Sequence, residues 1–228
     1  MQQSSNYFLR LERVLSTKRL ASYAQNCVTE KDALCLYIWN IAICESLYPS
    51  FQILEVGFRN AIHREIAKHA SNPTWLTSEV GFLRPDEVTA IRSAKDAIKT
   101  RARPGTEDVL IAELRFGFWT SLLDSHYELM WHKIIADVFP YMPKHDRLRR
   151  EASKLMQTVR RLRNSALHHH SIWHWRDLRD QHKQMHIMIG YICTSIAVMA
   201  KEVDRFPAIY QSGPGQLSAI ADAIIISN

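Results

Sequence analysis

Apolar residues recur every three to four positions through most of the chain, and no stretch keeps a regular alternation of period two. This spacing is typical of α-helices that bury one side. We expect helices over about 32–48, 51–69, 85–101, 108–139 and 175–203, and one from about 146 to the histidine cluster. Pro49 is expected to end the first helix, because proline lacks the N–H that a helix interior requires. The pattern therefore predicts an all-α fold.

One polar stretch interrupts the helical pattern between its two halves. It runs over about 71–107 and contains Pro73, Pro85 and Pro104. We predict a single domain over 1–228, with a core of about 30–70 and 108–203, a helical insert at about 71–107 and a C-terminal tail at about 204–228. The apolar end of that tail, 217–226, is expected to dock on the helices or on a partner.

The composition supports a folded chain without disulfide bonds. The 228 residues are 46% hydrophobic and 23% charged, and only seven are glycine, which argues against turn-rich β-sandwiches and barrels. None of the four cysteines has CxxC spacing, so we expect reduced thiols. The N-terminus lacks a secretory signal pattern, and the most apolar run, 187–200, is too short to cross a membrane. We expect a cytoplasmic protein with no membrane partner.

The positive charge gathers in one segment. Between Lys144 and Lys183 there are eleven basic and four acidic residues, a net charge of +7, against +6 for the whole chain. Seven of the eleven histidines lie in this segment or just beyond it, with Trp173 and Trp175 among them. Basic residues with interleaved aromatics suit an RNA-binding groove. A solvated helix face with two buried tryptophans would give the same composition.

The end of this segment's first helix separates two faces. A core stripe recurs at alternating spacings of four and three: Leu148, Ala152, Leu155, Val159, Leu162 and Ala166. Asn164 and His168 are four residues apart, so they share a face that points away from this stripe. Arg163 lies on the flank. These three side chains are therefore available to a ligand or to a partner subunit.

The same residues carry a family resemblance. Arg163-Asn164-Ser165-Ala166-Leu167-His168 resembles the R-N-x-x-x-H form of the RX4-6H signature of HEPN-domain ribonucleases. The segments LSTKRLASYA, ALCLYIWN, LEVGFRNAIH, FGFWTSLL and LRNSALHHHSIW together resemble the Abi-like abortive-infection family of bacterial HEPN proteins. The resemblance runs from about Leu15 to about Lys201. Three successive histidines and the Gly213-Pro214-Gly215 tail depart from the pattern, and spacing alone leaves the choice among His168, His169 and His170 open.

The resemblance implies a HEPN-type helical bundle, with extra terminal helices, that works as a homodimer. Two facing motifs would form one composite endoribonuclease site with Arg163, Asn164 and His168 as catalytic residues, with no metal and no other cofactor. The partners implied are an RNA substrate and an antitoxin, either RNA or protein, as in toxin–antitoxin and antiviral defence systems.

The chemistry of RNA cleavage explains these residue types. A histidine transfers protons near neutral pH, and the planar fork of an arginine holds two phosphate oxygens. Asn164 would orient the imidazole or the phosphate. We expect supporting roles for Glu55, Arg59, Asn60 and His169, and RNA binding by Arg160, Arg161, Trp173 and Arg176. Glu55, Arg59 and His63 form a ridge at four-residue spacing, which an ordinary Glu-to-Arg pair within the helix would also explain.

Two alternatives stay open at this point. His170/His174 and His182/His186 are both i, i+4 pairs, the spacing with which helices bind zinc or two metals, and His145-Asp146 resembles part of the HD phosphohydrolase motif. A metal-dependent phosphohydrolase would use the cluster between His170 and His186. The other alternative is a module that binds RNA or a protein partner without cutting.

Overall fold

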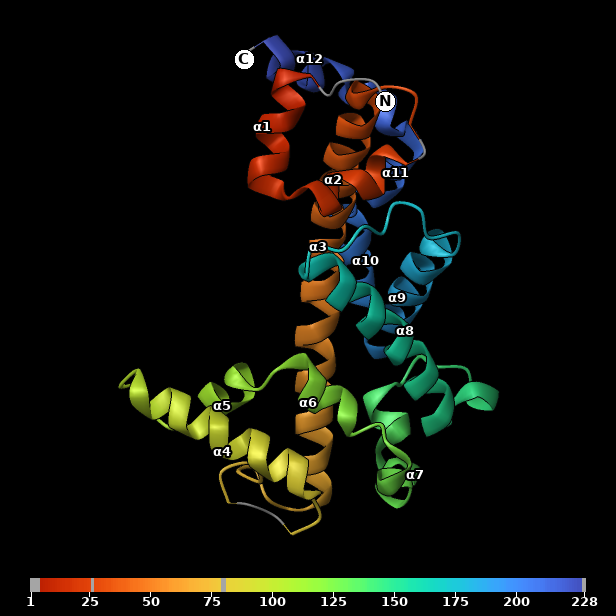
Figure 1. Ribbon diagram of the computed structural model, residues 1–228. Helices are drawn as coiled ribbons and strands as arrows, with labels where there is room; N and C mark the ends of the chain where they lie inside the picture. The colour runs from red at the N-terminus through yellow and green to blue at the C-terminus, as the bar shows by residue number, and fades with distance from the viewer. Residues whose placement is uncertain (1–4, 26, 79–80, 227–228) are drawn as a thin grey trace. The chain divides into compact units, whose positions relative to one another are not determined.

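The computed structural model describes the chain except residues 1–4, 26, 79–80 and 227–228. Every regular element among the described residues is a helix, which confirms the predicted all-α fold (Figure 1). Small parts of the sequence predictions concern residues outside that description, namely residues 1–4 of the N-terminal segment, 79–80 of the insert and 227–228 of the tail.

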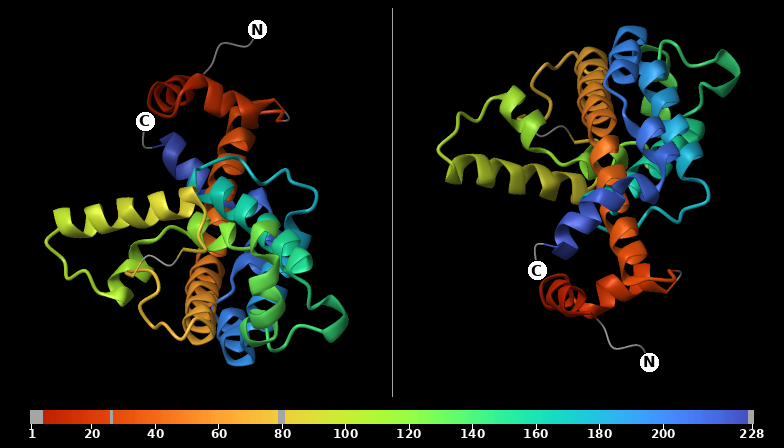
Figure 2. Two further views of the ribbon diagram at one scale, coloured as in Figure 1. Left: turned by 90° about the horizontal axis from the view of Figure 1, so that it is seen from below. Right: turned by 90° about the horizontal axis from the view of Figure 1, so that it is seen from above.

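Most of the helices follow one another through short connections, and a longer one, residues 168–177, joins α8 to α9 (Figures 1 and 2). The α-helices are α1 Asn6–Leu15, α2 Thr17–Ala24, α3 Glu30–His69, α4 Pro85–Thr100, α5 Glu107–Glu113, α6 Phe116–Ser121, α7 Glu128–Val138, α8 Arg149–Leu167, α9 Leu178–Ile192, α10 Thr194–Glu202, α11 Phe206–Ser212 and α12 Ser218–Ile226. Three short 3-10 helices are η1 Ser125–Tyr127, η2 Lys144–Asp146 and η3 Pro214–Leu217. The expected helices at 85–101 and before the histidine cluster are confirmed as α4 and α8.

The described residues form two compact units. Unit 1 takes in the described residues of Met1–Tyr48, Ser165–Leu178 and Asp204–Asn228. Unit 2 takes in those of Pro49–Asn164 and Arg179–Val203. Boundaries fall inside α3, inside α8 and after the first residue of α9, so these three helices contribute residues to both units. The expected division into core, insert and tail stays a prediction.

Pro49 does not end a helix. It lies inside α3, which continues from Glu30 to His69, so the predicted break there is wrong. A proline in this position removes the hydrogen bond to the carbonyl of Glu45 and costs about 3 kcal/mol. The helix persists because apolar side chains on both sides of the proline, among them Leu47 and Phe51, are buried. Burying such side chains contributes about 1.5–3 kcal/mol each, which offsets the loss.

Three of the longer helices end in the same way although the chain is poor in glycine. Ser71 after α3, Ala102 after α4 and His169 after α8 all adopt positive φ, at 49°, 50° and 60°. In each case the N–H of the positive-φ residue and the N–H of the residue after it donate to carbonyls of the last turn. After α8, for example, His169 N–H donates to the Ala166 carbonyl and His170 N–H donates to the Ser165 carbonyl. This is a Schellman motif built without glycine, and it satisfies the last helical carbonyls.

Two of the predicted helices are broken into shorter ones. The expected helix at 108–139 is divided into α5, α6, η1 and α7, and the one at 175–203 into α9 and α10. Leu114, Phe116, Phe118 and Trp119 are all buried, which a single straight helix with one buried stripe could not achieve. Cys193 is extended, with φ −162° and ψ 130°, and separates α9 from α10. The chain therefore changes direction, instead of continuing as one helix, where apolar residues lie on all sides of the helix axis.

In unit 1 the C-terminal helix packs on the first half of α3. Ala221 of α12 lies in a buried cluster with Leu34 and Cys35, and Ile224 packs against the same cluster. Lys31 forms an ion pair with Asp222 at 2.6 Å. The apolar end of the tail thus docks on α3 within this unit.

In unit 2 aromatic rings form the core. The ring of Phe58 on α3 stacks on Phe139 at 6.1 Å between centroids, and Phe139 stacks on Trp131 of α7 at 6.0 Å. Phe116 of α6 meets Phe58 edge-on at 6.5 Å. These contacts fix α6 against α3, which is the arrangement on which the candidate site depends.

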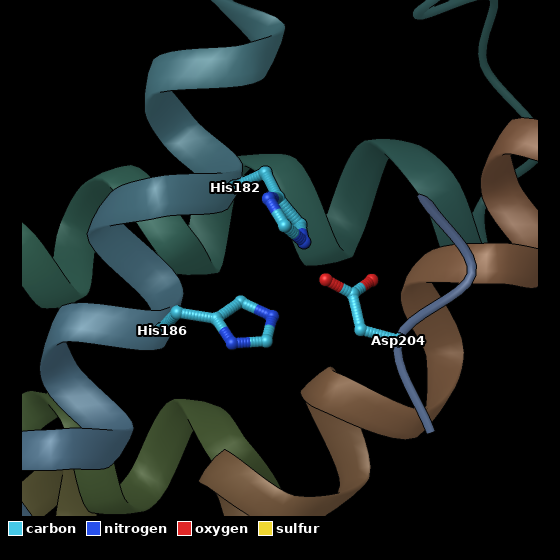
Figure 3. Close-up of side chains that lie close together, drawn as sticks. All are labelled: His182, His186 and Asp204. Carbon is cyan, nitrogen blue, oxygen red and sulfur yellow. The ribbon is translucent and has the colours of Figure 1, made fainter. Parts of the chain in front are cut away.

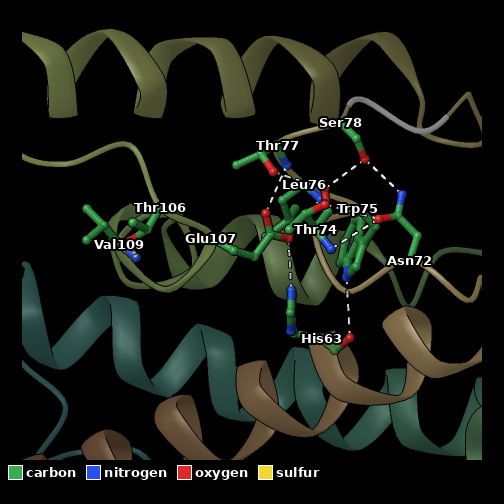
Figure 4. A network of polar contacts seen from close by, with 10 residues as sticks. All are labelled: His63, Asn72, Thr74, Trp75, Leu76, Thr77, Ser78, Thr106, Glu107 and Val109. Carbon is green, nitrogen blue, oxygen red and sulfur yellow. Dashed lines mark hydrogen bonds and ion pairs between the residues drawn. The ribbon is translucent and has the colours of Figure 1, made fainter.

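A polar network centred on Glu107 holds the segment that follows α3 (Figure 4). One carboxylate oxygen of Glu107 accepts hydrogen bonds from His63 Nε2 at 3.0 Å and from the Leu76 N–H at 2.9 Å, and the other accepts from the Thr77 N–H at 3.1 Å. Burial raises the pKa of this carboxyl, but the hydrogen bonds from His63, Leu76 and Thr77 outweigh it and the pKa is lowered overall. His63 therefore has a structural partner in the first turn of α5.

Candidate functional site

Helix α8 places Arg163 and Asn164 on unit 2. Its buried face consists of Ala152, Met156, Val159, Leu162 and Ala166. Of the predicted core stripe, Leu155 is only partly buried and Leu148 is 41% exposed, so those two positions of the prediction are wrong. Arg163 and Asn164 are half-buried and lie beside this stripe.

The guanidinium of Arg163 is held by three neighbours from different parts of unit 2. Its Nη2 donates to Glu55 Oε2 of α3 at 3.3 Å, and its Nη1 donates to Asn164 Oδ1 at 3.3 Å. Its Cζ lies 5.8 Å from the ring centroid of Phe116, within cation–π distance. The Arg163 and Glu55 side chains are 27% and 24% exposed, so solvent screens their ion pair only in part. These contacts fix the orientation of the arginine.

Among the residues of unit 2 expected to support the site, Glu55 touches Arg163. Asn60 is exposed on α3. Arg59 is half-buried, and its Nε has no hydrogen-bond partner among the described residues. The carboxylate of Glu55 bonds to Arg163 rather than to Arg59. An intrahelical pair of Glu55 with Arg59 therefore does not explain the position of this carboxylate. The supporting roles themselves stay predictions.

The histidines lie just beyond the end of α8, in unit 1. Since α8 ends at Leu167, His168 occupies the turn after the helix instead of its last turn. His168, His169 and His170 are all exposed, and the rings of His168 and His170 are 6.3 Å apart between centroids. The left-handed conformation of His169 sets the direction of this turn.

Two residues that sequence reasoning did not single out hold the histidine turn. Arg19 of α2 donates from Nη1 to the His169 carbonyl at 2.8 Å. The buried Asn40 of α3 accepts from the N–H groups of Ile172 at 2.8 Å and Trp173 at 3.2 Å, and donates to the His170 carbonyl at 3.3 Å. The pairs are separated by at least 130 residues, so spacing along the chain gives no signal for them. A buried asparagine on an apolar helix face was the available hint.

The residues expected to bind RNA fall into two groups. Arg160, Arg161 and Arg176 are exposed, and a Cβ on Gly117 of α6 would lie 3.6 Å from Arg160 Nη2. Trp173 is half-buried, and its ring stacks on that of Tyr23 at 6.4 Å between centroids. The arginines are therefore accessible, whereas Trp173 has a packing role within unit 1.

The two histidine pairs of the metal alternative differ. His170 and His174 lie outside helices, so the expected i, i+4 helical geometry is wrong for them. His182 and His186 lie on one face of α9 with ring centroids 4.5 Å apart (Figure 3). His186 Nε2 is also 3.1 Å from Ser50 Oγ of α3. The pair on α9 could supply two imidazole ligands to a metal. His145 and Asp146 form an exposed pair at 3.3 Å.

Comparisons with known proteins identify no relative. No protein-family model matches the chain, and neither a curated protein nor a solved structure is significantly similar to it. The Abi-like resemblance therefore depends on the motifs quoted from the sequence. Within the described residues, no helix is long and apolar enough to cross a membrane.

Proposed function

We propose that this protein is a metal-independent endoribonuclease whose site is built from Arg163, Asn164 and His168. The observation that carries the proposal is the fixed Arg163: an ion pair to Glu55, a hydrogen bond to Asn164 and the Phe116 ring hold its guanidinium at the end of the basic helix α8. An oriented guanidinium stabilises charge that develops on a phosphate, because it does not have to reorganise during the reaction.

The reaction is an internal transfer at the RNA phosphate. The ribose 2′-oxygen attacks phosphorus while the bond from phosphorus to the 5′-oxygen of the next nucleotide breaks. A base takes the 2′-OH proton and an acid returns a proton to the leaving 5′-oxygen, so the products are a 2′,3′-cyclic phosphate and a 5′-OH. The exposed imidazole of His168 suits this proton transfer, and Arg163 stabilises the phosphorane. DNA resists because it lacks the nucleophile.

The resemblance to HEPN ribonucleases implies a composite site. Such a site would require a homodimer, in which the motifs of two copies face each other. An inhibitory partner, an RNA or a protein antitoxin, would restrain this activity in a defence system of the abortive-infection type. The charge of +7 between Lys144 and Lys183 supports an anionic substrate or inhibitor.

Two other functions are outcomes of the same test. The exposed arginines Arg160, Arg161 and Arg176 favour RNA binding even without cutting. The imidazole pair His182 and His186 is the observation that favours a metal-dependent phosphohydrolase.

To test this proposal, the purified protein is incubated with end-labelled single-stranded RNA in the presence of EDTA, and the rate of RNA cleavage is measured. We expect cutting by the wild type and a loss of at least about 100-fold in rate for Arg163→Ala and for His168→Ala. Arg13→Ala and His132→Ala serve as controls, because both residues are exposed and lie outside the basic segment. Activity that disappears in EDTA would instead indicate a metal enzyme, and RNA retained uncut would indicate a binding module. Toxicity on expression in bacteria that His168→Ala relieves is expected as well.

A further inference from the structure

A cleft of about 370 Å³ in unit 1 lies beside the histidine turn. Residues of α2 and of the turn after α8 face each other across it. It is lined by Ser16, Lys18, Arg19, Ser22, Tyr23, His169, His170 and Ser171. The volume falls in the range typical of ligand sites. The catalytic proposal uses none of these side chains for its chemistry.

The chemistry of the lining selects an anion. Lys18 and Arg19 are positively charged, two imidazoles add donors, and Ser16 and Ser171 add hydroxyl groups, while the Ser22 hydroxyl already donates to the Arg19 carbonyl. None of these described lining residues is acidic. Lys18, His169 and His170 are exposed, so their polar atoms are accessible. The phenol of Tyr23 is neutral at pH 7, as in any tyrosine, and burial raises its pKa further, to about 12. Lysine, arginine and hydroxyl donors together are the groups that bind phosphate.

The cleft is also held in shape. Arg19 uses Nη1 for the His169 carbonyl at 2.8 Å, which ties α2 to the histidine turn. A guanidinium has five N–H donors, so the same residue retains donors for a ligand. Asn40 fixes the other side of the turn through the N–H groups of Ile172 and Trp173. A site whose walls are already ordered loses little entropy when a ligand binds.

We propose that this cleft binds a backbone phosphate of the RNA substrate that neighbours the scissile one. His170 lines the cleft, and its ring centroid is 6.3 Å from that of His168, so a strand whose reacting phosphate lies at His168 would pass the cleft. Lys18 and Arg19 would contact that neighbouring phosphate. The position on the strand rests on the proposed ribonuclease function, whereas the binding of phosphate does not.

The experiment measures binding separately from cutting. The probe is a short 2′-O-methyl RNA, which keeps the phosphates and lacks the nucleophile, and its affinity is measured by fluorescence anisotropy between about 50 and 200 mM salt. Lys18→Gln removes one charge in the cleft. Arg13→Gln is the matched control, because Arg13 is exposed on the neighbouring helix α1 and does not line the cleft. Ser22→Glu places a carboxylate at the cleft, and the melting temperature of each variant checks its folding.

We expect Lys18→Gln to weaken binding by up to about fivefold and to reduce the slope of log affinity against log salt by about 0.7, the value for one phosphate contact on a single strand. Ser22→Glu should weaken binding further, and Arg13→Gln should leave slope and affinity unchanged. Equal effects of Lys18→Gln and Arg13→Gln on RNA binding would contradict the proposal that the cleft binds phosphate. If inorganic phosphate displaces the RNA probe at the same concentration as the probe, the cleft is a site for free phosphate. That result would contradict the assignment of the cleft to RNA.

The two proposals fail in different ways. If the wild type cuts RNA in EDTA but Lys18→Gln binds the probe like Arg13→Gln, the proposed phosphate site is contradicted and the proposed ribonuclease function is supported. If neither the wild type nor any variant cuts RNA but Lys18→Gln alone loses a phosphate contact, the proposed ribonuclease function is contradicted and the proposed phosphate site is supported.

Discussion

The carboxylate of Glu55 lies 3.3 Å from the guanidinium of Arg163, although the two residues are 108 positions apart in the chain. Helix α3 thus supplies the partner that orients the arginine of α8. Because Arg163 also contacts Asn164 and Phe116, the carboxylate is one of several restraints and its removal should leave the fold intact.

Glu55→Gln is expected to lower kcat by up to about 100-fold with little change in KM, because a misplaced guanidinium stabilises the transition state less well. The free energy of unfolding should change by less than about 1 kcal/mol, the usual range for a partly exposed ion pair. Glu45→Gln is the control, since Glu45 lies on the same helix and pairs with Arg205. RNA cleavage kinetics and urea unfolding measure the two effects. A Glu55→Gln enzyme with wild-type kcat would show that the ion pair serves packing alone.

Asn40→Ala should destabilise the protein by about 1–3 kcal/mol, because it leaves the N–H groups of Ile172 and Trp173 without their acceptor. Asn40→Asp keeps the acceptor but loses the bonds to the His170 carbonyl and to Cys44 Sγ, and it buries a carboxylate oxygen against that carbonyl, so it should be destabilising as well. Urea unfolding measures both, with Asn60→Ala as the exposed control on the same helix. Equal stability of Asn40→Ala and Asn60→Ala would contradict this role.

His169→Gly should raise the free energy of unfolding by about 1 kcal/mol, because φ of 60° is strained for a residue with a Cβ and not for glycine. His169→Ala removes the same imidazole and keeps the strain, so it should not stabilise. Comparing the two by urea unfolding isolates the backbone effect. If both variants have the stability of the wild type, the turn after α8 carries no strain.

Glu107→Gln should cost about 1–3 kcal/mol, because an amide cannot accept hydrogen bonds from His63, Leu76 and Thr77 at once. Asp108→Asn is the control, since it changes an exposed carboxylate of the same helical turn.

The lowered pKa of Glu107 also gives a pH dependence. A carboxyl whose pKa is lower in the folded state binds fewer protons there, so its stabilisation is present above the unfolded pKa and is lost as pH falls through the folded one. Urea midpoints taken at acidic pH should therefore fall more steeply for the wild type than for Glu107→Gln. Parallel curves would contradict this contribution.

The sequence predicts the class of fold and several helix bounds but not the breaks. The spacing of apolar residues identified α4 and α8, because each buries one clear face. It did not show that α3 passes through Pro49, since the cost of one proline is offset by packing that only the folded chain provides. The break at Cys193 has no proline or glycine beside it and gave no local signal.

The candidate site was predictable where it is local. Arg163, Asn164 and His168 are neighbours in sequence, and their spacing was sufficient to propose them. Glu55, which pairs with Arg163, and Arg19 and Asn40, which hold the histidine turn, come from segments more than 100 residues away. The stop of α8 at Leu167 depends on a left-handed histidine, a conformation that sequence patterns assign to glycine.

The central claim is cleavage through the ribose 2′-oxygen, and the chemical ends of the products test it most directly. An RNA oligonucleotide cut by the wild-type protein in EDTA should yield a 2′,3′-cyclic phosphate and a 5′-OH, and a single 2′-deoxy substitution at the cut position should block cleavage there. A 3′-OH with a 5′-phosphate, or cutting that continues at the 2′-deoxy position, would contradict the account.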